Sequence, residues 1–330
     1  FTIFFITFFV LYPLGHGVEP FTNIQHGNAT FSSNGNLFTV DQSSNGLILT
    51  WGNGFNIGNQ ETLTFNQLSV DSAVLNRDTS GVFSSIFGNL NARGQVYVIN
   101  PQGIIIGPSG RVNVGGFYGS TYDISNDDFK NFVSGARETI RFQGDSTAAI
   151  INRGEINATQ DVFLIAAKVE NHGSIKGDHV GLAAGSDVLL ARSGEQRVFI
   201  KPTEASGQLD VGVLNKGSIE AFTTELKAVG GNVYALAINH EGIIRARQVE
   251  KVGGRIFLHG GAGSAVRIAG VMEARGMGVE SSGGKIDVRG GKIDLTAEAL
   301  LGCEWRYCRW VRSTSEAIAQ VRDLVSMLLR

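Results

Sequence analysis

A short phrase that returns along the chain constrains the fold more than any other feature of this sequence. The phrase is Asn, any residue, Gly, any residue, Ile. It occurs at Asn152–Ile156, Asn171–Ile175 and Asn215–Ile219, with a variant at Asn239–Ile243. The starts are 19, 44 and 24 residues apart, which we interpret as one, two and one turns of a unit of about 20 residues. A period this short indicates a solenoid of stacked repeats.

The stretches between these phrases are typical of β-strands. Short apolar alternations bounded by glycine and asparagine occur at 95–100, 161–166 and 254–259. Residues 20–300 show almost no helical periodicity, and the weak candidate at 126–132 is interpreted as a turn or a short helical excursion. A single unit of this size cannot bury its apolar side, whereas stacking on the next unit buries it and pairs the strand edges. We therefore predict an all-β parallel β-helix, with asparagines stacked in a ladder and with glycine and asparagine in tight or left-handed corner turns.

Composition agrees with this fold and excludes other classes. Glycine occupies 44 of 330 positions, and hydrophobic residues make up 42%, whereas disordered chains are poor in apolar residues. The net charge is −2 without any basic block, so we expect no nucleic-acid partner. At about 20 residues per turn the body would form roughly 13 or 14 coils. A β-sandwich is the alternative fold.

The N-terminal segment differs from the body. Residues 1–17 begin with an almost unbroken apolar run, which is shorter than the about 20 residues that a membrane span needs. Small residues follow it, placed for cleavage before Val18, as is typical of a signal peptide. No methionine or basic residue precedes the run, which indicates a clipped start. A buried first strand is the alternative interpretation.

Residues 301–330 form an atypical tail. Glycine becomes rare there, and both cysteines of the chain, Cys303 and Cys308, lie in it. A capping-box pattern, followed by apolar residues at helical spacing, predicts a helix over 314–329. The cysteine pair has no histidine partners at ligand spacing, so we predict no metal site. The tail is interpreted either as a natural cap or as read-through from a shifted frame.

A series of motifs in a fixed order runs through residues 46–129. It includes Phe55–Gly58, Phe65–Gln67, Ala73–Arg77, Ser84–Gly88, Leu90–Ile104, Val112–Gly116 and Ser120–Ser125. In order and spacing, the series resembles the N-terminal secretion domain of two-partner-secretion (TpsA-type) exoproteins, the filamentous haemagglutinin family. The resemblance implies a right-handed parallel β-helix with an N-terminal cap over residues 18–300. It also implies an exported, adhesin-like or haemagglutinin-like exoprotein.

The resemblance further implies an export route and its partners. The Sec machinery would carry the chain into the periplasm. There, POTRA domains of a TpsB-type barrel transporter would recognise it and export it across the outer membrane of a Gram-negative-type envelope. The product would be secreted or held at the cell surface, where a missing downstream region would contact a host or neighbouring cell. No cofactor is implied.

The family's Asn-Pro-Asn-Gly hallmark lies at Asn100-Pro101-Gln102-Gly103, with Gln102 in place of the usual asparagine. Because Pro101 fixes φ and Gly103 tolerates positive φ, the segment is interpreted either as a structural turn or as a contact for the transporter. A second hallmark, Asn-Pro-Asn-Leu, is absent, and residues 66–68 occupy the comparable region. The candidate recognition set also includes four residues of the neighbouring motifs: Asn56, Asn66, Asn76 and Arg77.

A carbohydrate-acting enzyme on the same fold is the alternative function, and a truncated structural stub is a third interpretation. Glycoside hydrolysis needs paired carboxylates at a set separation. Asp161, Asp178 and Asp187 could line one side of a β-helix, as could Asp287 and Asp294, but solvated turns explain them as well. The sequence contains no nucleophile elbow, no His-Glu-x-x-His and no phosphate-binding loop. We therefore expect neither catalysis nor a metal site.

Overall fold

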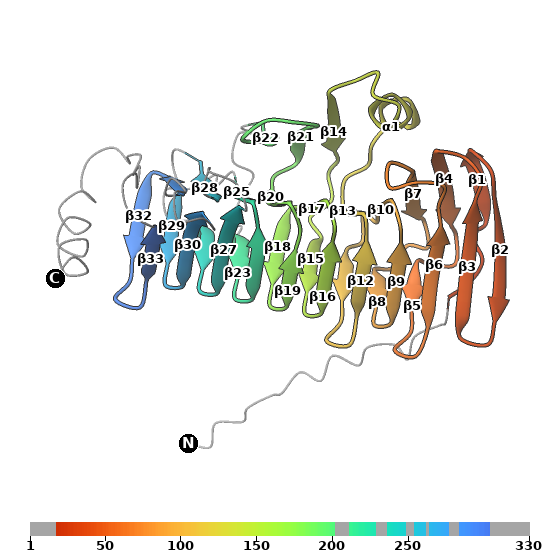
Figure 1. The fold of residues 1–330 in the computed structure, drawn as a ribbon, viewed down its shortest axis with the longest axis horizontal. Coiled ribbons are helices and arrows are strands. Elements are labelled where there is room, and N and C mark those ends of the chain that lie inside the picture. Colours follow the sequence, from red (N-terminus) through yellow and green to blue (C-terminus); the bar gives the residue numbers. More distant parts are fainter. Residues whose placement is uncertain are drawn as a thin grey trace, which may run out of the picture.

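The chain winds in successive turns that stack along one axis, and the strands of these turns form three long sheets (Figure 1). The computed structural model describes residues 18–201, 211–228, 236–248, 254–261, 264–276 and 284–303. These residues form 33 strands and one helix, α1 (Asn126–Val133), so the predicted all-β parallel β-helix is confirmed. No helix among them is long and apolar enough to cross a membrane. The predicted signal peptide, the predicted helix over 314–329 and Cys308 lie outside the described residues.

Each turn places one strand in sheet A, then one in sheet C, then one in sheet B. In order across the sheet, sheet A contains β1 (Asn23–His26), β4 (Gly46–Trp51), β7 (Ala73–Asp78), β10 (Gln95–Ile99), β13 (Gly116–Ser120), β17 (Asp161–Ala166), β20 (His179–Ala184), β25 (Thr223–Ala228), β28 (Arg255–Gly260) and β31 (Lys285–Arg289). Sheet C contains β5 (Asn56–Ile57), β8 (Ser84–Ile86), β11 (Ile104–Ile106), β15 (Ala149–Asn152), β18 (Lys168–Asn171), β23 (Val211–Asn215), β26 (Leu236–His240), β29 (Ala265–Ile268) and β32 (Lys292–Leu295). Sheet B contains β2 (Ala29–Asn34), β3 (Leu37–Gln42), β6 (Thr62–Asn66), β9 (Asn89–Ala92), β12 (Arg111–Val114), β16 (Glu155–Ala158), β19 (Ser174–Lys176), β24 (Ser218–Ala221), β27 (Ile243–Gln248), β30 (Val271–Gly276) and β33 (Leu300–Cys303).

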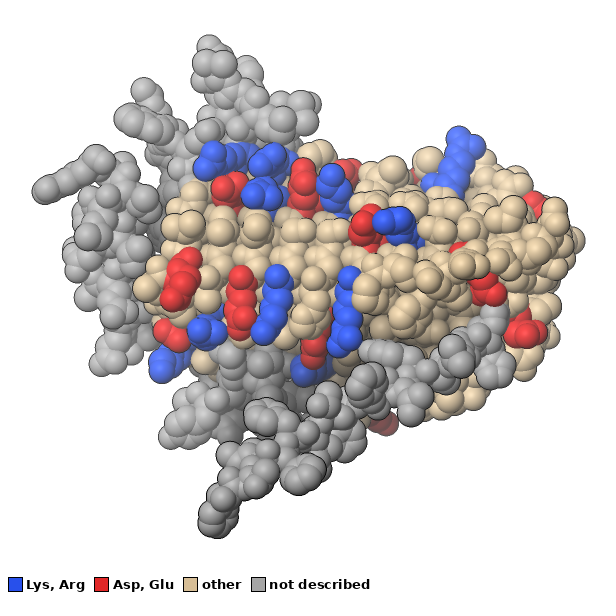
Figure 2. Space-filling model, turned by 90° about the horizontal axis from the view of Figure 1, so that it is seen from below, with Lys and Arg blue, Asp and Glu red and all other residues tan. Residues whose placement is uncertain are grey.

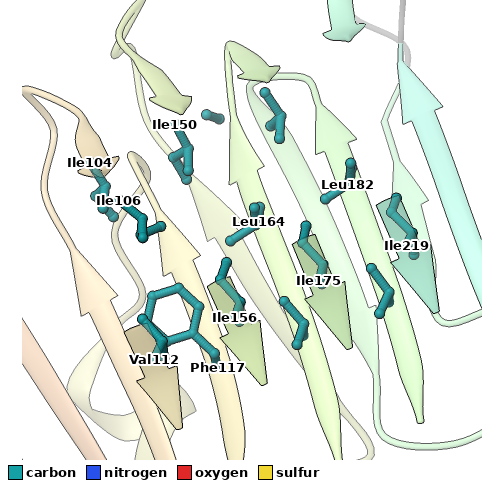
Figure 3. Packing of buried hydrophobic residues seen from close by; sticks show 14 of the residues in the cluster. Ile104, Ile106, Val112, Phe117, Ile150, Ile156, Leu164, Ile175, Leu182 and Ile219 are labelled. Atoms are coloured by element: carbon teal, nitrogen blue, oxygen red, sulfur yellow. The ribbon is translucent and has the colours of Figure 1, made fainter. Parts of the chain in front are cut away.

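The interior of the shaft is built from aligned apolar side chains. Parallel pairing puts Val112, Ile156, Ile175 and Ile219 in register on four successive strands of sheet B. All four side chains are buried, and Figure 3 shows them facing residues of the other two sheets. Full burial of each such side chain stabilises the fold by about 1.5–3 kcal/mol. The stacking that the repeat predicts is therefore the main source of the core.

A buried polar ladder runs beside this core, as predicted. The Asn152 Nδ2 atom donates to Asn171 Oδ1 at 2.8 Å, and Asn171 Nδ2 donates to Asn215 Oδ1 at 2.8 Å. Asn215 Nδ2 then lies 3.1 Å from His240 Nδ1. In the structure, His240 rather than Asn239 pairs with Asn215. The start that the variant phrase predicts for the fourth repeat, at Asn239, is therefore one residue too early.

The predicted turn count is wrong for a related reason. Asn171 and Asn215 lie on neighbouring strands, so the interval of 44 residues is one turn and not two. The additional residues leave the shaft and form strands β21 (Asp187–Ala191) and β22 (Val198–Ile200) outside it. Ten strands cross sheet A in the described part of the chain, fewer than the 13 or 14 coils expected.

The glycines of the repeated phrase are required for close approach between turns. A Cβ atom on Gly173 would lie 2.0 Å from the carbonyl oxygen of Gly154, and one on Gly217 would lie 2.0 Å from that of Gly173. Neither Gly173 nor Gly217 has a positive φ, so the left-handed alternative of the predicted corner turns does not apply to these glycines. Their role is to let the corner backbones touch.

An N-terminal cap closes the first turn. Strand β1 pairs antiparallel with β4, and β2 forms an antiparallel hairpin with β3. Aromatic rings fill the end of the shaft: the centroids of Phe21 and Trp51 are 6.0 Å apart, and those of Trp51 and Phe55 are 5.1 Å apart, both edge-on. The cap therefore covers apolar side chains that the first turn would otherwise expose.

Two excursions from the shaft cover the outer face of sheet A (Figure 1). The first carries α1, where the structure confirms the predicted helical segment, and strand β14 (Thr139–Gln143). The second carries β21 and β22, which join β14 in the antiparallel three-stranded sheet D. Phe129 and Phe132 of α1 are buried there in a second core that includes the stacked rings of Tyr97 and Tyr118.

Charged side chains occupy the outer faces of the C-terminal turns. Figure 2 shows acidic and basic residues in rows on that half of the molecule, whereas the N-terminal half of this face is largely uncharged. Across sheet B, Lys176 lies 3.8 Å from Glu220 and Arg245 lies 3.4 Å from Glu273. Opposite charges on neighbouring strands are compatible with the parallel register.

Candidate partner-recognition site

The predicted hallmark segment forms a tight turn between β10 and β11. The Gly103 amide donates to the Asn100 carbonyl at 3.0 Å, and the Gln102 amide donates to Asn100 Oδ1 at 2.8 Å. Gly103 has a φ of 112°, and a Cβ there would lie 2.9 Å from the carbonyl oxygen of Ala149. Both facts require glycine at this position.

Asn100 also joins a buried polar network that crosses three turns. Its Nδ2 atom donates to the Val82 carbonyl at 2.8 Å and to Ser84 Oγ at 2.9 Å. Ser84 Oγ donates to Asp78 Oδ2 at 2.6 Å, and the same oxygen accepts from the Phe55 amide at 2.8 Å. Asp78, Ser84 and Asn100 are all buried. Sequence reasoning missed Asp78 and Ser84, although both lie within the region of matching motifs.

The outer side of the same corner is accessible. Pro101 and Gln102 are exposed, and Val82 beside them has 56% of its surface accessible. The Pro101 carbonyl accepts a hydrogen bond from Ser146 Oγ at 2.6 Å, which ties the turn to the returning end of the first excursion. We call Val82, Pro101 and Gln102 the corner face. The buried network holds these three side chains in place.

Arg77 lies on the other side of β7 and connects the cap to the first excursion. Its Nε atom is 2.8 Å from Asp123 Oδ1, and its Nη1 atom donates to Asn126 Oδ1 at 2.6 Å and to Gln25 Oε1 at 3.2 Å. Its Nη2 atom donates to the Ile124 carbonyl. The side chain is only 11% exposed. The guanidinium group therefore positions the start of α1 against β1.

The remaining predicted residues have separate partners. Asn76 is buried, accepts from Trp51 Nε1 at 3.0 Å and donates to the Tyr97 carbonyl at 3.0 Å. Asn56 Oδ1 accepts from the amide and the hydroxyl of Ser85, at 3.0 and 2.8 Å. Asn66 is exposed and donates to Asp41 at 2.9 Å. Of the eight predicted residues, four form the turn, and the other four occupy different places on the first turns.

A second buried polar cluster fixes sheet D to the shaft. Glu225 Oε1 lies 2.6 Å from His179 Nε2 and accepts from the Arg197 amide at 2.6 Å, while Glu225 Oε2 lies 2.6 Å from Lys227 Nζ. Burial opposes ionisation of Glu225, but the hydrogen bond from His179 and the charge of Lys227 together lower its pKa below the ordinary value. Arg197 is further paired with Asp161 at 2.7 Å.

The acids proposed for a carbohydrate-acting site are structural partners in part. Asp161 pairs with Arg197, and Asp187 pairs with Arg141. Asp287 is buried and accepts two bonds from Arg289. Across the described ranges, no group of three or more His, Cys, Asp or Glu residues is placed to hold a metal ion.

The described residues form a capped parallel β-helix with an excursion sheet on one face, and comparison with known proteins gives its family. The sequence matches the TPS secretion domain family over residues 17–273. This chain belongs to that family. It contains the secretion domain of a two-partner-secretion exoprotein, a class exported through a dedicated outer-membrane transporter.

Individual relatives agree with this assignment. The chain is 30% identical over 212 residues to a heme/hemopexin-binding protein of Haemophilus influenzae, covering 62% of the chain and 23% of that relative. It resembles the HMW1 secretion domain from Haemophilus influenzae, with a TM-score of 0.62, 29% identity, and coverage of 84% of this chain and 72% of the other. The filamentous hemagglutinin secretion domain shares the fold, with a TM-score of 0.54 and 15% identity over 84% of this chain and 98% of the other. These relatives are secretion domains and a heme-binding exoprotein rather than known enzymes.

Proposed function

We propose that the chain delivers an adhesin-like surface protein in two steps, carried by its first two segments. Residues 1–17 act as a signal peptide for the Sec machinery. Residues 18–300 form the secretion domain, which POTRA domains of a TpsB-type barrel transporter recognise in the periplasm. Residues 301–330 follow as a tail. Contact with a host or neighbouring cell surface belongs to the whole protein, since the chain spans only 23% of the length of the curated relative it matches.

The observation that supports this proposal is the free outer edge of the cap hairpin. Strand β2 ends sheet B and, among the described strands, pairs only with β3. Thr30 and Ser32 of β2 are exposed, and so is most of the strand. A free edge offers unpaired backbone groups to an incoming strand of another domain. We therefore assign recognition by the periplasmic POTRA domains to pairing along β2.

The corner face supplies a second contact in this proposal. Asn100 and Gly103 shape the turn from inside, whereas Pro101, Gln102 and Val82 face outward. Asn100→Asp, with folding and secretion measured separately, tests whether the hallmark acts only through the turn. Loss of secretion only together with loss of fold would leave a structural role alone.

The decisive experiment adds positive charge to the free edge. Lysine on an edge strand opposes strand addition. In cells that express the transporter, we expect the double variant Thr30→Lys/Ser32→Lys to fold normally and to be secreted at least about tenfold less, a loss of roughly 1.4 kcal/mol of recognition. Circular dichroism of purified domains and immunoblots of the culture medium measure the two properties.

Asn113→Lys is the matched control for added charge. Asn113 is exposed on β12, which is paired on both sides within sheet B. A lysine there changes the charge without changing any free edge, so secretion should remain at the wild-type level. Normal secretion of the β2 double variant, with the fold intact, would refute recognition along this edge.

A further inference from the structure

The backbone nitrogen of Val18 lies against a carboxylate at the base of the cap. Val18 is 6% exposed, and its side chain belongs to the core of the shaft. Its nitrogen donates to Glu61 Oε2 at 3.1 Å, and the Gly58 amide donates to the same oxygen at 2.6 Å. The contact joins positions 43 residues apart in the sequence. It therefore depends on the folded first turn.

The segment after Val18 is fixed to the first turn by its own bonds. The Thr22 amide donates to the Thr50 carbonyl at 2.8 Å, and the Gly52 amide donates to Thr22 Oγ1 at 3.2 Å. The ring of Phe21 packs edge-on against Trp51, with 6.0 Å between centroids. These contacts hold the nitrogen of Val18 near Glu61 without requiring any residue before Val18.

Glu61 is held rigidly and has no cationic partner in the part of the chain that the structure describes. Its amide donates to the Gly58 carbonyl at 2.9 Å, and its carbonyl accepts from the Asn89 amide at 2.9 Å. Within the described residues it forms no ion pair with any Lys, Arg or His. The two hydrogen bonds that its side-chain carboxylate accepts both come from backbone amides. A partly buried carboxylate with only neutral donors gains most from an adjacent positive charge.

We propose that cleavage before Val18 creates an α-ammonium group that forms an ion pair with Glu61 and fixes the N-terminal cap. This inference rests on the proposed signal-peptide processing. Hydrolysis of the Gly17–Val18 peptide bond by a protease consumes one water, leaves a carboxylate on Gly17 and leaves an ammonium group on Val18. The neutral N–H donor at 3.1 Å from Glu61 is thereby replaced by a charged group with three donors.

Because of the ion pair, cleavage before Val18 would stabilise the folded cap. An uncleaved chain offers Glu61 only an amide, whereas a processed chain offers a charge at the same place. Charge-assisted hydrogen bonds are roughly twice as strong as neutral ones. The cap, which covers the end of the shaft and carries the free edge of β2, is then most stable in the processed form.

Four purified proteins test the pairing. Two of them begin at Val18, after an N-terminal tag is removed with a protease that leaves no extra residue. The other two retain one additional glycine before Val18. In each pair, one protein has Glu61 and the other has Glu61→Gln. The glutamine of this variant keeps an acceptor for the Gly58 amide, so the substitution removes charge with little change of shape. Relative to the glycine-extended protein, whose amine is displaced by one residue, we expect an amine on Val18 itself to raise Tm by about 2–4 °C with Glu61 and by nothing with Glu61→Gln. Equal effects of the extra glycine in both backgrounds would overturn the pairing.

A titration separates an ion pair from a purely steric effect. An α-amino group ordinarily has a pKa of about 7.7–8.0. In the protein beginning at Val18, NMR should show a higher value for this amine, and Glu61→Gln should return it to the ordinary range. Glu19→Gln, at an exposed neighbouring acid, should leave it unchanged. An amine that titrates in the ordinary range with Glu61 present would overturn the proposal.

N-terminal sequencing of the secreted protein tests the processing step separately. A first residue other than Val18 would overturn the inference at that step, whatever the purified proteins show. The melting temperatures, the titration and the identity of the first residue do not depend on pairing along β2. Failure of the edge variants to affect secretion would therefore count against the proposed recognition alone.

Discussion

Asn171 lies in the middle of the buried ladder and uses both ends of its amide. It accepts from Asn152 and donates to Asn215, each at 2.8 Å. Asn171→Ala would remove the donor to Asn215 Oδ1 and the main acceptor of Asn152 Nδ2, which would keep only the Ser174 carbonyl at 3.4 Å. Because each unsatisfied buried polar group costs about 1–3 kcal/mol, we expect the free energy of unfolding to fall by about 2–5 kcal/mol. Urea denaturation of the secretion domain measures this loss.

Asn157 provides the control for that substitution. It lies on the outer face of sheet B, partly exposed, and donates to Asn113 at 3.3 Å. Since water can replace this partner, Asn157→Ala should change the free energy of unfolding by no more than about 0.5 kcal/mol. Similar losses for Asn157→Ala and Asn171→Ala would contradict a special contribution from the buried ladder.

His240 makes the ladder sensitive to acid. It takes the place of an asparagine, with Nδ1 next to Asn215 and Nε2 next to the Val271 carbonyl at 3.2 Å. Burial lowers its pKa from 6.5 to about 4, against the opposing effect of these two hydrogen bonds. The unfolded chain therefore binds a proton first, and stability is lost as pH falls from 6.5 towards 4.

Between pH 7 and pH 5, His240 should reduce the free energy of unfolding by about 2 kcal/mol. His240→Asn keeps an amide in the ladder and removes the titrating group, so that part of the pH dependence should disappear. Urea denaturation at the two pH values gives the comparison. An unchanged difference between pH 7 and pH 5 in His240→Asn would show that other groups cause it.

One buried carboxylate joins several groups where sheet D is attached to the shaft. Glu225 of β25 contacts the Arg197 amide at 2.6 Å, just before β22, and is paired with Lys227 and His179. Glu225→Gln would leave the buried Lys227 ammonium without its counter-charge. We expect roughly tenfold faster tryptic cleavage within residues 192–197, because local opening exposes that loop.

Glu195→Gln is the comparison for this prediction. Glu195 is 57% exposed and lies 3.5 Å from both Arg255 and Lys285, so its pairs are screened by solvent. Cleavage should then proceed at the wild-type rate. Equal rates for Glu195→Gln and Glu225→Gln would mean that the buried cluster does not control opening of sheet D.

The elements that sequence could predict are those whose contacts repeat. Asn152, Asn171 and Asn215 each contact the same residue type one turn away, so a phrase in the sequence is enough to indicate the ladder. The second excursion adds residues without altering the phrase, which is why the spacing of 44 residues indicates two turns where the structure has one. The turn at Asn100–Gly103 is predictable from its proline and glycine, which act locally.

Contacts that do not recur from turn to turn leave no repeated phrase in the sequence. Arg77 meets Asp123 across 46 residues, and Glu225 meets His179 across 46 residues, each only once in the described chain. Ser84 and Asp78, which hold Asn100, also have no spacing that marks them. A charged or polar residue whose distant contacts do not recur along the chain looks like any exposed residue in sequence, so these contacts of the candidate site required the structure.

At the scale of the whole molecule, stability is divided among neighbouring turns. Each strand inside the shaft pairs with the strands before and after it in its sheet, and ion pairs such as Lys176–Glu220 and Arg245–Glu273 join adjacent strands. In such a one-dimensional array each repeat is stabilised by its neighbours rather than by distant repeats. The two ends are not equivalent, since aromatic rings of the cap cover the N-terminal end.

This asymmetry predicts opposite outcomes for two truncations. A chain of residues 18–228 leaves β23, β24 and β25 as edge strands but retains the cap, both excursions and Glu225, so it should remain folded. A chain of residues 46–303 lacks β1, β2 and β3 and uncovers Trp51, Phe55 and Phe65, whose rings would then face water. Exposed apolar surface and unpaired strand edges favour aggregation. Circular dichroism and size-exclusion chromatography distinguish the two. Equal behaviour of the truncated chains would mean that the cap is dispensable and that the stacked turns alone determine the fold.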